Sequence, residues 1–184
     1  MQYGGKTNLK KFITEYRDKN QLIEEKIIND IIFQIYIGIK EIHKSNIIHR
    51  DLKPENIFID DKNKILIGDF GISKILEANK KYASTRSGTF EYMAPEIIKG
   101  EKYDKKVDIY ALGCIIYELF TLNVYYLDKI INEKECKINL DLYPKKWQEL
   151  IDLLLKKDYH KRPDIDEVDK YLNKNEIILT LEIE

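Results

Sequence analysis

A short stretch of the chain combines side chains that could carry out acid–base or metal chemistry. The sequence IIHRDLKPENIFID, residues 47–60, places five polar side chains between two apolar runs, namely His49, Arg50, Asp51, Lys53 and Asn56. A further acid, Asp69, ends the next apolar run. A carboxylate can accept the proton of a hydroxyl group, and carboxylate or amide oxygens suit Mg²⁺. Asp and Asn are also common turn residues, so turn capping is an open alternative for Asp51, Asn56 and Asp69.

Regular structure is predicted on both sides of this stretch. Residues 20–46 carry isoleucines at helical spacing and predict one long helix with a buried face. Residues 56–60 and 65–70 predict two short strands in a hairpin, with Asp60 to Asn63 at its tip. Three more helices are predicted, at residues 105–122, 144–158 and 162–174. The polar stretch therefore lies between a long helix and a hairpin.

Two segments have no identifiable structural partner. Residues 72–90 show no sustained periodicity of apolar residues. A connection of that length inside a compact domain is usually functional or disordered. Residues 175–184 alternate like a strand, but the sequence does not identify the strand with which they would pair.

Composition excludes several classes of protein. The chain has 184 residues, 43% of them hydrophobic, which suits one domain with a core of useful size. A formal net charge of -1 gives no general electrostatic reason to expect nucleic acid or an anionic membrane as partner. Cys114 and Cys136 lack paired spacing, which argues against a disulfide scaffold or a zinc site. Because no run reaches the roughly 18 apolar residues of a membrane span, we expect an intracellular protein, cytoplasmic with the nucleus left open.

Three motifs resemble those of a known family. HRDLKPEN at residues 49–56 matches the H-R-D-L-x-x-x-N loop of eukaryotic protein kinases at every specified position. DFG at residues 69–71 and APE at residues 94–96 follow in the order that these kinases show. The letters KPEN and GTFEY resemble the serine/threonine type, and GDFGISK weakly resembles NIMA-related kinases.

The resemblance implies an α+β, mainly α-helical fold, namely the carboxy-terminal lobe of a protein kinase with the amino-terminal β lobe absent. We expect a hinge-like segment at residues 1–7, the large lobe at residues 8–173 and a tail at residues 174–184. The glycine-rich loop, strand lysine and helix glutamate of an amino-terminal kinase lobe do not occur in the sequence. We therefore expect Met1 to be an internal methionine of a longer reading frame, with roughly 80 residues upstream, a typical increment for a small domain.

The resemblance also implies catalytic roles. Asp51 would be the base that accepts the proton of the substrate hydroxyl. Asn56 and Asp69 would bind Mg²⁺ through their oxygens. Lys53 would contact the transferred phosphate, and Thr89 would hydrogen-bond to Asp51 and Lys53.

ATP is the cofactor that the resemblance implies, together with Mg²⁺. Phe58 would form the floor beneath the adenine. Asp69, Phe70 and Gly71, the DFG motif, would complete the cofactor-binding residues.

Four further residues would have structural roles. His49 would be a packed core histidine near Phe70. Asp108 would be a buried aspartate that anchors the backbone of the catalytic loop. Arg162 would pair with Glu96, the glutamate of the APE motif.

Regulation is implied by Arg50, which directly precedes Asp51. In eukaryotic protein kinases this arginine commonly binds a phosphate on the activation segment, because a guanidinium matches a phosphate dianion well. Thr85 lies at the usual position, so we expect phosphorylated Thr85 to order this segment. Ordinary loop polarity is the alternative.

Two classes of function compete. In the first, the chain is part of a serine/threonine kinase that transfers the γ-phosphate of ATP to a protein substrate. In the second, it is a non-catalytic kinase lobe that binds a partner or acts as a scaffold. Joint retention of a base and two Mg²⁺ ligands favours the first, because a binding module has no need of them. A small-molecule phosphotransferase is disfavoured by the APE motif and by the helix that starts at DIYALG, residues 108–113.

Unless an amino-terminal lobe or a partner covers the cleft, we expect the chain alone to be weak or inactive.

Overall fold

A computed structural model describes residues 7–69, 90–126, 129, 136–175 and 177. Several predicted features lie outside the described residues. These are most of the hinge-like segment, most of the tail, and Phe70, Gly71, Thr85 and Thr89.

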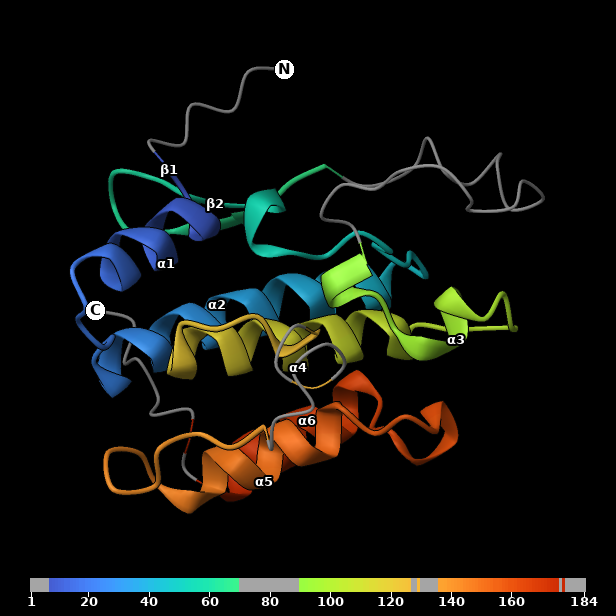
Figure 1. Cartoon of the computed structure of the whole chain (residues 1–184). Coiled ribbons are helices and arrows are strands. Elements are labelled where there is room, and N and C mark those ends of the chain that lie inside the picture. Colours follow the sequence, from blue (N-terminus) through green and yellow to red (C-terminus); the bar gives the residue numbers. More distant parts are fainter. Residues whose placement is uncertain (1–6, 70–89, 127–128, 130–135, 176, 178–184) are drawn as a thin grey trace.

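Helices account for most of the described fold (Figure 1). The helices are α1 (Leu9–Asp18), α2 (Glu25–Lys44), α3 (Pro95–Ile98), α4 (Lys106–Thr121), α5 (Lys145–Leu154) and α6 (Ile165–Lys174). Short 3₁₀ turns occur at η1 (Pro54–Asn56), η3 (Phe90–Tyr92) and η5 (Tyr159–Lys161). The long helix predicted at residues 20–46 is present as α2, and the three later helices lie within their predicted ranges.

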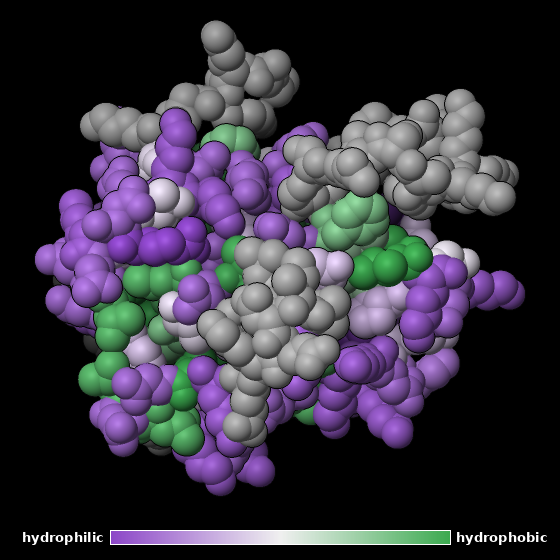
Figure 2. All heavy atoms as spheres, viewed as in Figure 1, coloured by the Kyte–Doolittle hydropathy of each residue, from purple (hydrophilic) through white to green (hydrophobic). Residues whose placement is uncertain are grey.

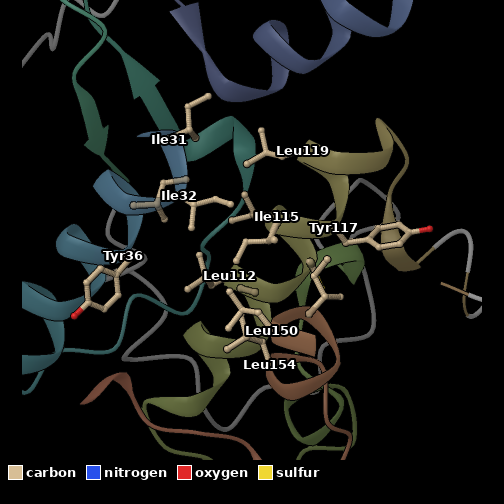
Figure 3. Packing of buried hydrophobic residues seen from close by; sticks show 14 of the residues in the cluster. Ile31, Ile32, Tyr36, Leu112, Ile115, Tyr117, Leu119, Leu150 and Leu154 are labelled. Carbon is tan, nitrogen blue, oxygen red and sulfur yellow. The ribbon is translucent and has the colours of Figure 1, made fainter. Parts of the chain in front are cut away.

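Helix α4 forms the centre of the hydrophobic core. It lies between α2 and α5 in Figure 1, and every residue from 107 to 120 is buried. Figure 3 shows side chains of α2, such as Ile32, and of α5, such as Leu150, gathered around Leu112 and Ile115 of α4. Each fully buried aliphatic side chain of this kind contributes roughly 1.5–3 kcal/mol. The core therefore holds α4 rigidly, and polar groups on α4 are fixed with it.

The sheet has three short antiparallel strands in the order β1 (Thr7–Asn8), β2 (Ile57–Ile59) and β3 (Ile65–Ile67). Strands β2 and β3 form the predicted hairpin, with Phe58 opposite Leu66. The Asp60 side chain closes its turn by accepting hydrogen bonds from the backbone N–H groups of Lys62 and Lys64, both at 2.8 Å. Strand β1 was not predicted, because two residues are too few to show an alternating pattern.

Helix α2 holds the hairpin through a close contact and a polar bridge. A Cβ atom on Gly38 would lie 2.7 Å from Cδ1 of Ile67, so the absence of a side chain lets α2 approach β3. Gln34 accepts a hydrogen bond from the N–H of Ile65 at 2.8 Å and donates one to the carbonyl of Asn63 at 3.1 Å. The hairpin is therefore fixed against the same helix that leads into the polar stretch.

Hydrophilic side chains predominate on the face shown in Figure 2, with apolar side chains in limited patches. Among the described residues, no helix is both long enough and apolar enough to cross a membrane.

Candidate active site

The backbone of the polar stretch is anchored by one buried carboxylate. Asp108, on α4, is 1% exposed. It accepts hydrogen bonds from the backbone N–H groups of His49 and Arg50, both at 2.9 Å, and lies 2.9 Å from Nε2 of His43. Arg50 adopts a left-handed conformation with φ of 70°, which is costly for a residue with a side chain. The two hydrogen bonds that His49 and Arg50 donate to Asp108 stabilise that conformation and so fix the direction of the following residue, Asp51.

His49 joins the polar stretch to the end of the hairpin. Its side chain is buried, and its Nδ1 accepts a hydrogen bond from the N–H of Asp51 at 3.3 Å. This contact assigns the ring proton to Nε2, which therefore donates to the carbonyl of Gly68 at 3.0 Å. His49 thus lies where a structural core histidine was expected, although its expected neighbour Phe70 is outside the described residues.

Asp51, Lys53 and Asn56 meet in one polar group. The Nδ2 atom of Asn56 donates to the backbone carbonyl of Asp51 at 2.8 Å and to its carboxylate at 3.1 Å. Nζ of Lys53 lies 3.0 Å from the same carboxylate oxygen. Because the amide nitrogen of Asn56 is directed at Asp51, its oxygen Oδ1 is the atom that can ligate a cation.

Asp69 lies at the end of the hairpin, next to this group. The N–H of Gly68 donates to the carbonyl of Asn56 at 2.9 Å, so the residue before Asp69 is bonded to the loop that carries Asp51. A Cβ atom on Gly68 would lie 2.8 Å from the ring of Phe58, which shows how closely that ring packs beside the chain. Asp69 itself is exposed, with φ of 52°. Asp69 is therefore an exposed residue that follows directly on the contact between the hairpin and the loop that carries Asp51.

The donor set fits Mg²⁺ rather than a metal held by the protein alone. Asn56 and Asp69 offer an amide oxygen and a carboxylate, the hard ligands that Mg²⁺ uses together with substrate phosphates and water. Within the described part of the chain there is no group of three or more His, Cys, Asp or Glu side chains that could hold a metal ion. A site of this composition would need a phosphate-bearing ligand to complete it.

Glu96 and Arg162, distant in sequence, form a buried ion pair. The guanidinium of Arg162 donates to both carboxylate oxygens of Glu96, at 2.7 and 3.1 Å, and also to the carbonyls of Lys106 and Lys156. It lies 5.0 Å from the ring centroid of Tyr110, within cation–π range. The pair fixes α3 against the start of α4.

Arg50 has capacity for a further ligand. Its Nε atom is buried and has no hydrogen-bond partner among the residues that the structure describes. Its guanidinium lies 5.6 Å from the ring centroid of Tyr103. Thr85, its expected partner when phosphorylated, is outside the described residues.

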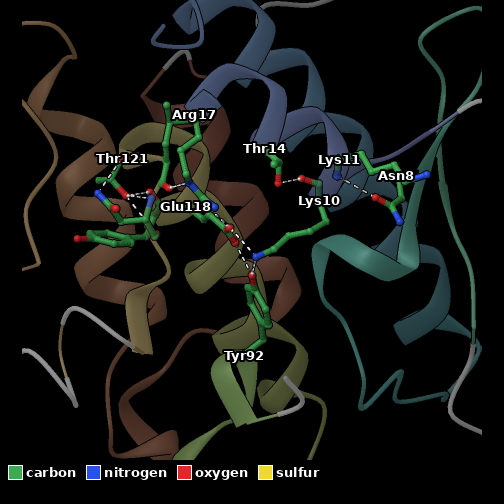
Figure 4. A network of polar contacts seen from close by, with 11 residues as sticks. Asn8, Lys10, Lys11, Thr14, Arg17, Tyr92, Glu118 and Thr121 are labelled. Atoms are coloured by element: carbon green, nitrogen blue, oxygen red, sulfur yellow. Dashed lines mark hydrogen bonds and ion pairs between the residues drawn. The ribbon is translucent and has the colours of Figure 1, made fainter. Parts of the chain in front are cut away.

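A second polar group, at the other end of α4, was missed in the sequence (Figure 4). Glu118 is 0% exposed and contacts Lys10 at 2.9 Å, Arg17 at 3.3 Å and the hydroxyl of Tyr92. The sequence predicts a helix at residues 105–122 but assigns no role to Glu118 within it. The available signal was an acid inside an otherwise apolar run, which implies a buried charge that needs partners.

Burial raises the pKa of two acids at this second group. Burial, followed by the charge of Glu118, raises the pKa of the Tyr92 hydroxyl. Burial also raises the pKa of Glu91, while the charge of Lys10 opposes that shift.

Comparison with known proteins agrees with the motifs. The family model for the protein kinase domain matches residues 1–172. The serine/threonine-protein kinase Nek9 of Xenopus laevis is 39% identical over 159 residues, which cover 82% of this chain and 17% of that protein. Nek2 of Homo sapiens is 33% identical over 181 residues, with coverages of 91% and 40%. For nekl-2 of Caenorhabditis elegans the identity is 36% over 182 residues, with coverages of 91% and 50%.

The chain therefore belongs to the protein kinase family. Its similarity to Nek9, Nek2 and nekl-2 confirms the predicted resemblance to serine/threonine kinases of the NIMA-related group. The helices and small sheet fit a protein kinase-like fold. The chain spans only 17% to 50% of the length of these three relatives.

Proposed function

We propose that this chain is the carboxy-terminal lobe of a serine/threonine protein kinase, which transfers the γ-phosphate of ATP to a serine or threonine hydroxyl of a protein substrate. The observation that carries the proposal is the group formed by Asp51, Lys53 and Asn56, in which two side chains contact one carboxylate. A turn cap needs neither the lysine nor the buried asparagine. The names of the similar kinases support serine and threonine as the acceptors.

Asp51 is the proposed base. It takes the hydroxyl proton of the substrate while the hydroxyl oxygen forms a bond to the γ-phosphorus. The bond from that phosphorus to its bridging oxygen breaks, and ADP leaves. Lys53, 3.0 Å from the Asp51 carboxylate, is placed to contact the transferred phosphate beside the base.

Asn56 and Asp69 are the proposed Mg²⁺ ligands. Bound Mg²⁺ would neutralise charge on the phosphate oxygens. Asn56 presents Oδ1 for this purpose because Asp51 occupies its amide nitrogen, and Asp69 is an exposed residue that carries a carboxylate. The DFG residues Phe70 and Gly71, and Thr89, belong to the proposed site through their motifs alone.

The outer face of the hairpin favours a second folded unit that covers the proposed nucleotide site. Phe58 pairs with Leu66 across β2 and β3, and Leu66 is 41% exposed. Phe58 is the proposed floor for adenine, and a floor alone leaves the nucleotide open to water. An amino-terminal lobe, or another protein in its place, would close the site from above. Binding through this face is also what the alternative, non-catalytic function would use.

Phosphorylation of Thr85 is the proposed activating input. A phosphate at Thr85 would satisfy the buried Nε atom of Arg50, which is adjacent to Asp51. The change Thr85→Ala should lower activity under phosphorylating conditions. Unchanged specific activity would contradict this part of the proposal.

The experiment that tests the function measures phosphate transfer to a serine-containing protein by this chain and by the full protein expressed from its gene. We expect Asp51→Asn to reduce transfer by about 10²- to 10⁴-fold, the usual contribution of a general base. Chelation of divalent cations should abolish transfer. The matched control is Asp141→Asn, which changes an exposed aspartate in the loop before α5. Transfer that persists in Asp51→Asn, or that is absent from the full wild-type protein, would contradict the proposal.

A further inference from the structure

A cavity lies between α1, the amino end of α2 and the hairpin, which are on the same side of the molecule in Figure 1. Its volume of about 540 Å³ is within the range of cavities that bind a ligand. No residue of the proposed catalytic group is among the described residues that line it. The walls are mainly apolar and include the residue that follows the end of α6, the main contributors being Phe12, Ile27, Ile31, Ile59, Ile65 and Ile177.

The wall of this cavity also carries a polar atom without a partner. Asn29 of α2 lines the cavity, and its Oδ1 atom is buried with no hydrogen-bond partner in the described part of the chain. A buried acceptor that no donor meets is unfavourable, because it has lost its bonds to water. An occupant that fits the cavity therefore needs apolar side chains together with an N–H or O–H donor.

The end of α6 leads the chain to this cavity. Ile177 is 5% exposed, and its N–H donates to the carbonyl of Leu172 at 3.0 Å. Nζ of Lys146 donates to the carbonyl of Asn175 at 3.2 Å. The chain is thus fixed where it leaves α6, with Ile177 already in the wall of the cavity.

The sequence that follows Ile177 has the pattern that such an occupant needs. Residues 178–184, ILTLEIE, lie outside the described residues. In an extended chain alternate side chains share a face, so the face of Ile177 would continue with Leu179, Leu181 and Ile183. Seven extended residues span about 23 Å at about 3.3 Å each, enough to cross a cavity of this volume. The opposite face would be mostly polar, with Ile178, Thr180, Glu182 and Glu184.

We propose that residues 178–184 dock in this cavity as an extended segment of the same chain. Leu179, Leu181 and Ile183 fill the apolar space, and a backbone N–H of the segment donates to Oδ1 of Asn29. The docked segment ties the end of α6 to the hairpin strand that leads to Asp69. The inference goes beyond the proposed function and does not depend on it, because docking within the chain requires no catalysis.

The test measures backbone amide exchange of residues 178–184 in the full protein and in an isolated peptide of residues 175–184. In the wild-type protein we expect exchange at least about tenfold slower than in the peptide, because docked amides are shielded from water. Leu181→Asp places a charge on the apolar face and should return exchange to the rate of the peptide. The matched control Thr180→Asp adds the same charge to the opposite face and should keep the protection.

A change in the cavity wall tests where the segment binds. Asn29→Leu removes the acceptor at similar size, and we expect one amide of the segment to exchange about tenfold faster, the scale of one hydrogen bond. Asn29→Asp keeps an acceptor and should retain the protection. Cooperative urea unfolding shows that each variant is folded, and Ile183→Asp takes the place of Leu181→Asp if that variant fails this check.

Four outcomes would overturn the inference. Exchange of the wild-type segment at the peptide rate would leave the cavity to another occupant. Equal exchange in Leu181→Asp and Thr180→Asp would show that the apolar face does not seat the segment. Unchanged protection in Asn29→Leu would place the segment elsewhere. Protection that grows with protein concentration would assign the cavity to the segment of a second copy.

Discussion

Helix α4 carries a buried carboxylate near each end, and the two have different kinds of partner. Asp108, near the amino end, is bonded to backbone N–H groups of His49 and Arg50 and to the ring of His43. Glu118, near the carboxyl end, is bonded only to side chains among the described residues, those of Lys10, Arg17 and Tyr92. Both carboxylates are almost fully buried.

The difference in partners makes the surroundings of Asp108 fixed and those of Glu118 adjustable. Main-chain donors are present whatever side chain a position carries, so Asp108 fixes the backbone of the loop that precedes Asp51. Side-chain donors can be exchanged by substitution, and those of Lys10 and Arg17 are partly exposed. The carboxylate at the amino end of α4 is therefore held to main-chain groups, and the one at the carboxyl end to side chains that substitution can change.

The largest effect is expected from Asp108→Ala. It leaves two buried backbone N–H groups and His43 without their acceptor, and each unsatisfied buried group costs about 1–3 kcal/mol. We expect the free energy of unfolding to fall by roughly 3–5 kcal/mol, measured by urea denaturation. Asp108→Asn, which keeps one acceptor oxygen, should cost less. A loss below about 1 kcal/mol for Asp108→Ala would remove the claim that this carboxylate fixes the loop.

A smaller effect is expected from Glu118→Gln. The amide keeps an acceptor for Tyr92, and the ammonium and guanidinium groups of Lys10 and Arg17 can turn toward water. We expect a loss of about 1–3 kcal/mol in the same measurement, with amide exchange of the His49 and Arg50 N–H groups unchanged. If this variant cost as much as Asp108→Ala, or loosened the backbone at His49 and Arg50, the contrast between the two ends would be wrong.

The parts of the site that could be predicted are those that form a continuous pattern or have a family counterpart. Asp51, Lys53 and Asn56 lie within six residues of one another, and the match of this stretch to the kinase loop predicted that they share a site. Asp108, Glu96 and Arg162 carry no local signal of their contacts. Their positions were anticipated only because the motifs resemble those of kinases.

The parts that could not be predicted depend on folding between distant segments. Lys10 lies 108 residues from Glu118, and nothing near either residue identifies the other as its partner. Strand β1 exists because Thr7 and Asn8 meet the hairpin edge, not because two residues favour a strand. Long-range polar contacts of this kind have no sequence period, so pattern analysis cannot find them.

The smallest effect is expected from a third carboxylate, which has side-chain partners and lies near the surface. Asp169 of α6 accepts hydrogen bonds from Tyr36 and from Lys40, the latter at 2.8 Å, and its side chain is 31% exposed. Such pairs contribute about 1 kcal/mol or less, so Asp169→Asn should cost no more than that at pH 7.

The pH dependence of this third site gives the contrast a further test. The hydrogen bond from Lys40, followed by that from Tyr36, lowers the pKa of Asp169 below its ordinary value of 3.8. The ionised form is thus favoured in the folded state, so the contribution is present above this pH and is lost as the pH falls below it. The difference in unfolding free energy between wild type and Asp169→Asn should therefore shrink in acid, as followed by urea denaturation. A difference as large as that of Asp108→Ala would mean that burial and main-chain donors do not decide which carboxylates fix the fold.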